Sequence, residues 1–197
     1  MKLSLATTAL VAIALSSAAS AQRLAPAVIA VVDTDRVSRE CTACVAAQAQ
    51  LRTQLQQAQT RQTQLQTQLQ TEGAPIQTAV TALAGRAPDA ALQTRIRAFQ
   101  TKEASANQEL QNRTRTLQST QANVNRQITE RLIPIIESVR NARGAALVVD
   151  KGATLASASN IDVTADVLAQ LNQQLPSVSV TPLPTPPAAP AARPQGR

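Results

Sequence analysis

Two cysteines, Cys41 and Cys44, are the most reactive side chains in this sequence. A Cys-x-x-Cys pair can act as a redox dithiol, form part of a metal site or attach haem. Val45 follows the pair, where haem attachment would require histidine. The surrounding pattern also lacks the βαβ setting of a thioredoxin-like site. We therefore expect a structural role for the two cysteines rather than redox catalysis.

The remaining composition argues against an enzyme. The chain has no histidine, which excludes Ser-His-Asp and Cys-His nucleophilic sites as well as histidine-ligated metals. Two cysteines alone cannot complete a four-ligand zinc site. The five glycines never fall in the spacing of a Walker A loop. Glu103 and Glu109 are six residues apart, a spacing that does not stack them on one helical face. We expect no catalytic site, no metal and no cofactor.

The N-terminal residues predict export. A positive start is followed by an apolar run over residues 3–15 and by Ala19-Ser20-Ala21, a small-x-small cleavage pattern. These features predict a cleavable signal peptide over residues 1–21, which is too short for a membrane-spanning helix. Gln22 stands where a lipoprotein would need cysteine. We therefore expect a soluble, exported mature protein.

Export to an oxidising compartment leaves several structural roles open for the cysteines. Cys41 and Cys44 could form a disulfide within the first turn of a helix, or each could pair with a cysteine of another protomer. They could also serve only as small apolar residues of a helical seam.

Two apolar segments far apart in the sequence predict a small β body. Residues 27–34 form a run rich in β-branched residues, which is typical of a strand buried on both faces. Residues 145–158 contain two apolar stretches about the turn Asp150-Lys151-Gly152, which predicts a β-hairpin.

The C-terminal end of the chain divides into a short helix and a tail. Residues 164–174 predict a helix capped by Thr164, with Asp166 as a favourable charge in its first turn. From residue 176 to residue 197 the sequence consists largely of Pro, Ala, Ser and Val, and we expect a disordered tail. The folded domain is then expected over residues 22–175.

The central residues 37–143 are poor in glycine and proline, and their apolar residues recur at steps of three and four, as in a coiled coil. The break at Gly85–Asp89 predicts two helices that form an antiparallel hairpin, with an arm of roughly 70–80 Å. Gly73-Ala74-Pro75 should kink or briefly break the first helix and Pro134 should kink the second, unless both helices tolerate these residues as local irregularities. The expected inner positions are Leu51, Leu55, Ala58, Gln62, Leu65, Leu69, Glu72, Ile76, Ala79 and Leu83, then Leu92, Ile96, Phe99, Glu103, Ala106, Leu110, Arg113, Leu117, Thr120, Val124, Ile128, Leu132, Ile135 and Val139.

The charge of the chain has two readings: it favours acidic partners, or, since the charges are scattered and mixed in sign, it serves solubility alone. The formal net charge is +7 at pH 7, and export argues against nucleic acid as the partner, as does the absence of Trp and Tyr for base stacking. The distal arm carries six basic residues, which we take as candidate partner-binding residues: Arg86, Arg95, Arg97, Lys102, Arg113 and Arg115. Residues 48–70 are nearly neutral, with eleven Gln in 23 positions.

The order of these segments resembles the Skp/OmpH family of periplasmic chaperones over about residues 27–175. The resemblance rests on a signal peptide, the strand Val28-Ile29-Ala30-Val31-Val32-Asp33, a long helical hairpin, the strand following Gly144, and Asp162-Val163-Thr164 before the final helix. It implies an α+β fold in which a small β-strand body trimerises and carries helical arms. It also implies a cavity between the arms that holds unfolded outer-membrane proteins without ATP.

The resemblance makes the body the expected trimer interface, with candidate residues Val28, Ile29, Val31, Cys41, Cys44, Leu147, Val148 and Val149. Weak contact with an anionic membrane or lipopolysaccharide would suit the basic arm. The Gln-rich proximal arm departs from the family's charged pattern. It supports an alternative function as a coiled-coil spacer or tether in the cell envelope, attached through the tail.

Overall fold

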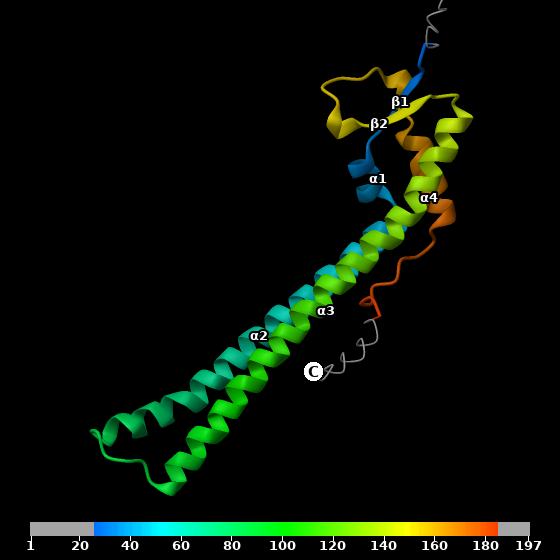
Figure 1. Ribbon diagram of the computed structural model, residues 1–197. Coiled ribbons are helices and arrows are strands. Elements are labelled where there is room, and N and C mark those ends of the chain that lie inside the picture. Colours follow the sequence, from blue (N-terminus) through cyan, green and yellow to red (C-terminus); the bar gives the residue numbers. More distant parts are fainter. Residues whose placement is uncertain (1–25, 185–197) are drawn as a thin grey trace, which may run out of the picture.

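The computed structural model describes residues 26–184, so the expected signal peptide and residues 185–197 lie outside the described part. Figure 1 shows a small body from which two long helices extend side by side. The elements are β1 (Ile29–Val32), α1 (Thr34–Glu40), α2 (Thr42–Ala82), α3 (Ala90–Ala142), β2 (Leu147–Asp150), the 3-10 turns η1 (Lys151–Ala153) and η2 (Ser159–Ile161), and α4 (Thr164–Gln174). We call α2, residues 83–89 and α3 the arm, and residues 83–89 its tip. Among residues 26–184, none of the helices combines the length with the apolar composition that a membrane-spanning helix requires.

The two strands form a parallel sheet, with Ile29 opposite Leu147 and Val32 opposite Asp150. The expected hairpin over residues 145–158 is wrong: only its first half is a strand. The chain turns after β2 because the carboxylate of Asp150 accepts a hydrogen bond from the backbone N–H of Gly152 at 2.7 Å. The free edge of β1 is instead met by residues near Asp162, where the N–H of Val163 donates to the carbonyl of Val31 at 2.8 Å.

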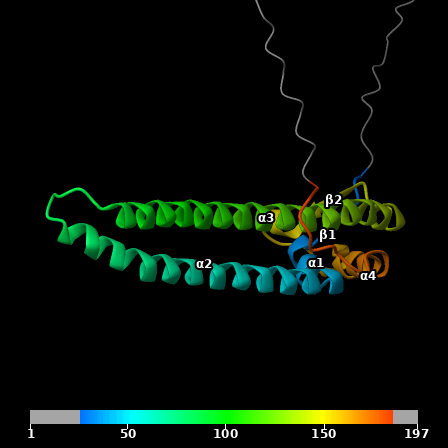
Figure 2. The same ribbon diagram turned by 90° about the horizontal axis from the view of Figure 1, so that it is seen from below.

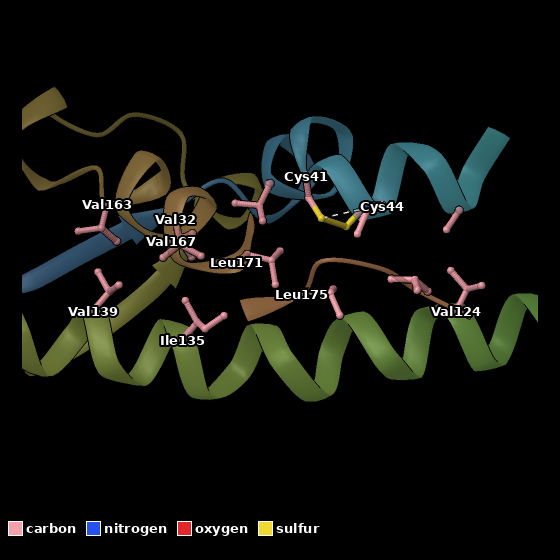
Figure 3. Close-up of a cluster of buried hydrophobic side chains, with 14 of the residues drawn as sticks. Val32, Cys41, Cys44, Val124, Ile135, Val139, Val163, Val167, Leu171 and Leu175 are labelled. Atoms are coloured by element: carbon pink, nitrogen blue, oxygen red, sulfur yellow. Dashed lines mark hydrogen bonds between the residues drawn. A yellow bond between two sulfur atoms is a disulfide. The ribbon is translucent and has the colours of Figure 1, made fainter. Parts of the chain in front are cut away.

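The hydrophobic core lies where the base of the arm meets the body (Figure 3). Val32 from β1 and Val37 from α1 contribute to it, as do Ile135 from α3 and Leu171 from α4. These side chains come from segments that are far apart in sequence, so the body forms only when the arm returns the chain to the sheet. Aliphatic side chains and the two cysteines fill this core, in keeping with a chain that has no Trp or Tyr.

The arm has a narrow inner seam and a largely exposed surface. In α3 the expected inner positions are almost all buried or half-buried, including Ala106, Thr120 and Val124, whereas Arg113 is exposed. In α2 the expected Leu55, Gln62 and Glu72 are exposed, and the neighbouring Gln54, Arg61 and Gly73 face inward instead. The α2 seam is therefore partly polar.

Neither helix of the arm is broken at the glycine and proline residues where kinks were expected. α2 continues through Gly73 and Pro75, and α3 continues through Pro134. Figure 2 shows α2 curving near its distal end. Gly73 lies directly against the ring of Phe99: a Cβ at this position would stand 2.8 Å from the ring's Cζ. The glycine therefore allows α2 and α3 to approach closely.

The end of the described chain differs from the expected disordered tail. Residues 176–184 leave α4 and run beside the arm (Figure 1), and Val178 and Val180 pack against the core cluster. The prediction of disorder from residue 176 is wrong for these nine residues. The expected cap of α4 also differs, because Val163 occupies the N-cap position and Thr164 is the first residue of the helix.

Candidate functional site

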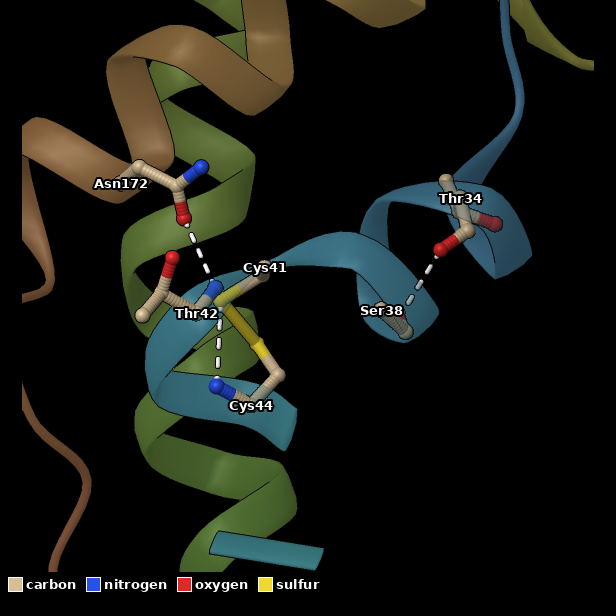
Figure 4. The surroundings of a disulfide bond; sticks show 6 residues. All are labelled: Thr34, Ser38, Cys41, Thr42, Cys44 and Asn172. Atoms are coloured by element: carbon tan, nitrogen blue, oxygen red, sulfur yellow. Dashed lines mark hydrogen bonds between the residues drawn. A yellow bond between two sulfur atoms is a disulfide. The ribbon is translucent and has the colours of Figure 1, made fainter. Parts of the chain in front are cut away.

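The cysteine pair lies at the junction between α1 and α2 (Figure 4). Cys41 and Cys44 form an intrachain disulfide, and both residues are fully buried. Cys41 is the N-cap of α2, where its Sγ accepts a hydrogen bond from the N–H of Cys44 at 3.2 Å. The N–H of Thr42 donates to Oδ1 of Asn172 in α4 at 2.9 Å. The pair therefore fixes the start of the arm, and its interior position removes both cysteines from the candidate interface.

The base of the arm is held by side chains at the end of each strand. Asp33 caps α1 by accepting a hydrogen bond from the N–H of Arg36 at 2.7 Å, while its own N–H donates to Oγ1 of Thr164 at 2.9 Å. The hydroxyl of Thr34 donates to Asp150 at the end of β2, and this hydrogen bond lowers the pKa of the Asp150 carboxyl. These contacts join β1, α1, β2 and α4 into one support for the arm.

Two of the six candidate basic residues of the arm pair with acids. Lys102 forms an ion pair with Glu72 of α2. Arg113 lies 2.9 Å from Glu109, which also accepts two hydrogen bonds from Arg61 of α2. Hydrogen bonds from Arg61 and then Arg113 lower the pKa of Glu109 from 4.5 to about 2. Glu72 and Glu109 thereby link the two helices; Lys102 has one acidic partner, whereas Arg113 shares the single carboxylate of Glu109 with Arg61.

The other four candidates have no acidic partner within 4.0 Å in the part of the chain that is described: Arg86, Arg95, Arg97 and Arg115. Arg86 lies at the tip, where its Nε donates to the carbonyl of Leu83 at 3.1 Å. Arg115 donates to the side chain of Asn112. The structure distributes the candidates along the distal arm rather than gathering them into one site.

Shallow grooves run along the arm between the two helices. The largest is lined mainly by amide, hydroxyl and small side chains, and includes Gln54, Ser105, Arg97 and Arg113. A smaller groove near Phe99 includes Arg95 and Lys102. Such linings can bind polypeptide by hydrogen bonds and by weak charge attraction. In residues 26–184 no group of three or more Cys, Asp or Glu side chains could hold a metal ion.

The candidate interface residues of the body separate into exposed and buried groups. Val28, Ile29 and Leu147 are 56%, 44% and 51% exposed, and the last two face each other across the sheet. Val148 and Val149 are half-buried. Val31 is only 2% exposed within the single chain, so it does not belong among the interface candidates.

Four residues that were not predicted hold the C-terminal segment on the arm: Gln54, Ser119, Asn123 and Gln127. The alternation of Val178 and Val180 with serine and threonine was the available signal, because period-two patterning is typical of an extended segment with one buried face. The proline-rich composition around it obscured that signal.

Comparisons with known proteins agree with this architecture. The family model "Outer membrane protein (OmpH-like)" matches residues 28–171. No curated protein matches the chain in sequence. Among solved structures, the crystal structure of a candidate outer membrane chaperone (OmpH-like) from Caulobacter crescentus matches with a TM-score of 0.66 and 19% sequence identity. The match covers 83% of this chain and 94% of the other, and at this identity it supports the fold alone. The family match spans most of the chain, which therefore belongs to the OmpH-like family of outer membrane proteins.

Proposed function

We propose that the protein is an ATP-independent holdase of the periplasm, which binds unfolded outer-membrane proteins along its arm and keeps them from aggregating. The observation that carries this proposal is the arm itself. Its two helices bury only a narrow seam and leave a long surface of amide, hydroxyl and basic side chains open to a partner. Membership of the OmpH-like family supports the choice of outer-membrane proteins as clients.

The charge of the distal arm suits weak and reversible binding. Arg86, Arg95, Arg97 and Arg115 are exposed, and no acidic group neutralises them among the described residues. Exposed charges attract acidic segments over about 10 Å at 0.1 M salt, and this attraction falls as salt rises. Many weak contacts allow a client to be held and then released. The same cations would give weak contact with an anionic membrane or lipopolysaccharide.

A homotrimer joined through the body is part of this proposal, with each arm as an antiparallel hairpin beside a shared cavity. A sheet of two strands is too small to be stable by itself. Val28, Ile29 and Leu147 leave apolar surface on the body that association with other protomers would cover. We retain these three residues, with Val148 and Val149, as the candidate interface.

The spacer alternative has less support. It uses the C-terminal tail as the attachment segment, yet residues 176–184 lie along the arm of the same chain. Its cellular test is the mobility of the protein in the periplasm, because an attached spacer would not diffuse freely.

The binding test uses an unfolded outer-membrane β-barrel and the full mature chain without nucleotide. The chain contains no Trp or Tyr, so the client's tryptophan fluorescence reports binding without background. The variant Arg95→Gln/Arg97→Gln should weaken binding several-fold at low salt and little at high salt.

A charge-matched control removes two cations near the body, Arg39→Gln/Arg131→Gln, which also lack an acidic partner within 4.0 Å in residues 26–184. This control should bind nearly as tightly as the wild type. Equal loss of affinity in both variants would show that only net charge matters and would count against an arm-specific surface.

A further inference from the structure

Residues 176–184, here called the strap, bind to the arm as an extended segment. Val178 is 8% exposed and belongs to the core cluster, and Val180 packs against the same cluster. Ser177, Ser179 and Thr181 are exposed. The strap therefore presents alternate side chains to the arm and to solvent, as a β-strand does, although it is not part of the sheet.

The polar contacts of the strap are made through its main chain. Gln127 pairs with both backbone groups of Ser179: its Oε1 accepts from the N–H at 3.0 Å and its Nε2 donates to the carbonyl at 2.9 Å. Gln54 donates to the carbonyl of Val180 at 3.1 Å. A side-chain amide thus takes the place of a neighbouring strand, which would supply the same donor and acceptor.

Two further side chains extend this ladder along α3. Asn123 donates to the carbonyl of Thr181 at 2.9 Å, and Oγ of Ser119 accepts from the N–H of Leu183 at 2.9 Å. Ser119, Asn123 and Gln127 are each one helical turn apart, so they line one stripe of α3.

Contacts within α3 orient the stripe. Oδ1 of Asn123 accepts a hydrogen bond from Arg126 at 3.0 Å, which leaves its Nδ2 directed at the strap. Arg126 is itself fixed by Glu130 at 2.8 Å.

We infer that Gln54, Ser119, Asn123 and Gln127 form a groove that binds the main chain of an extended polypeptide, with the strap as its resident occupant and an unfolded client segment as the competing one. The hydrogen bonds go to backbone groups, so the groove does not require the strap's own sequence. It requires extended backbone and small apolar residues at alternate positions, as at Val178 and Val180.

This requirement matches one class of client. Strands of outer-membrane β-barrels alternate apolar and polar residues along about ten positions, so an unfolded barrel carries many segments with the period of the strap. The identity of this client rests on the proposed holdase function, whereas the groove and its occupant rest on the contacts above.

The test releases the strap without altering the arm. Val178→Asp/Val180→Asp places two charges on the buried face of the strap, and the matched control Ser177→Asp/Ser179→Asp places them on its exposed face. Ser179→Pro is a second release variant, because it deletes the N–H that donates to Gln127. The probe is a fluorescein-labelled peptide with the sequence of residues 176–184, and its binding to the full mature chain is followed by fluorescence polarisation.

Both release variants should bind the peptide at least tenfold more tightly than the wild type and the control do. Adding Gln127→Ala to a release variant should weaken binding at least fivefold, and a peptide of the same composition without alternation should bind poorly. Equally weak peptide binding to the wild type and to both release variants would overturn the inference that this groove binds extended main chain.

Competition with an unfolded β-barrel separates this inference from the proposed function. The barrel should displace the peptide from the release variants. If the wild-type chain suppresses aggregation of the barrel, yet the barrel leaves the peptide bound to the release variants, the holdase stands and the groove is not its client site. If the peptide binds as expected but no variant suppresses aggregation, the groove stands as a site for the strap and the holdase proposal fails.

Discussion

Reducing the Cys41–Cys44 disulfide should lower the free energy of unfolding by about 2 kcal/mol, because the bond closes a loop of only about four residues. In a folded unit of this size, that change corresponds to a decrease in melting temperature of roughly 4–8 °C. The assay is a thermal melt followed by circular dichroism at 222 nm, with and without a phosphine reductant. Complete reduction is verified by alkylation and mass spectrometry.

The variant Cys41→Ala/Cys44→Ala is the control for this experiment. It should melt below the wild type by a similar amount, show no further shift with reductant and suppress client aggregation as well as the wild type. A fully reduced wild type with an unchanged melting temperature would refute the structural role assigned to the bond. Loss of client protection without loss of stability would instead point to redox function.

Three further predictions concern contacts along the chain. Glu109→Gln should cause a small decrease in the melting temperature at pH 7, since it removes the partner of Arg61 and Arg113. The Glu109 pKa lies below its ordinary value, so this stabilisation is complete above about pH 4.5 and is lost as pH falls through about 2. Melting curves of both proteins should therefore converge at low pH, and a constant difference would contradict the ion pairing. Gly73→Ala should destabilise the wild type in urea denaturation, because a Cβ at Gly73 meets the Phe99 ring, and it should cost about 1 kcal/mol less in a Phe99→Leu background; additivity would contradict this contact. Asn172→Ala should cost about 1 kcal/mol in the same assay by leaving the N–H of Thr42 without its partner in α4, and an unchanged midpoint would argue against that hydrogen bond.

The sequence predicted α3 better than α2 for a physical reason. Apolar residues such as Leu110, Val124 and Ile135 recur on the inner face of α3, and these residues are buried or half-buried in the structure. The proximal half of α2 consists largely of Gln, Thr and Ala, so its inner face has little hydrophobic contrast. Gln54 contacts Val180 and Arg61 contacts Glu109 of α3, and no local periodicity distinguishes these two residues from their neighbours.

The errors in the body arise from contacts that a local pattern does not contain. Residues 147–150 pair with β1 from across the whole arm, so the apolar stretch after Gly152 has no strand partner and does not form a hairpin. The strap was missed because its binding partners, such as Gln127 and Gln54, are 52 and 126 residues away from the groups they contact. Only the alternation of Val178 and Val180 indicated that one side of this segment is buried.

The paired residues Ile29 and Leu147 leave apolar surface exposed on the body of the single chain. Cross-strand apolar partners usually face a core, and here they face solvent in one protomer. Substituting Leu147→Lys would place a charge on this surface without disturbing the core cluster, which does not include Leu147. If the proposed homotrimer forms through the body, this variant should remain folded but shift to monomer in analytical ultracentrifugation.

The most direct test of the holdase proposal is light scattering after a urea-unfolded outer-membrane β-barrel is diluted into buffer with the mature protein and no nucleotide. The proposal predicts that scattering is suppressed and that suppression saturates near one trimer per client. Aggregation as fast as in buffer alone, at both low and moderate salt, would contradict it.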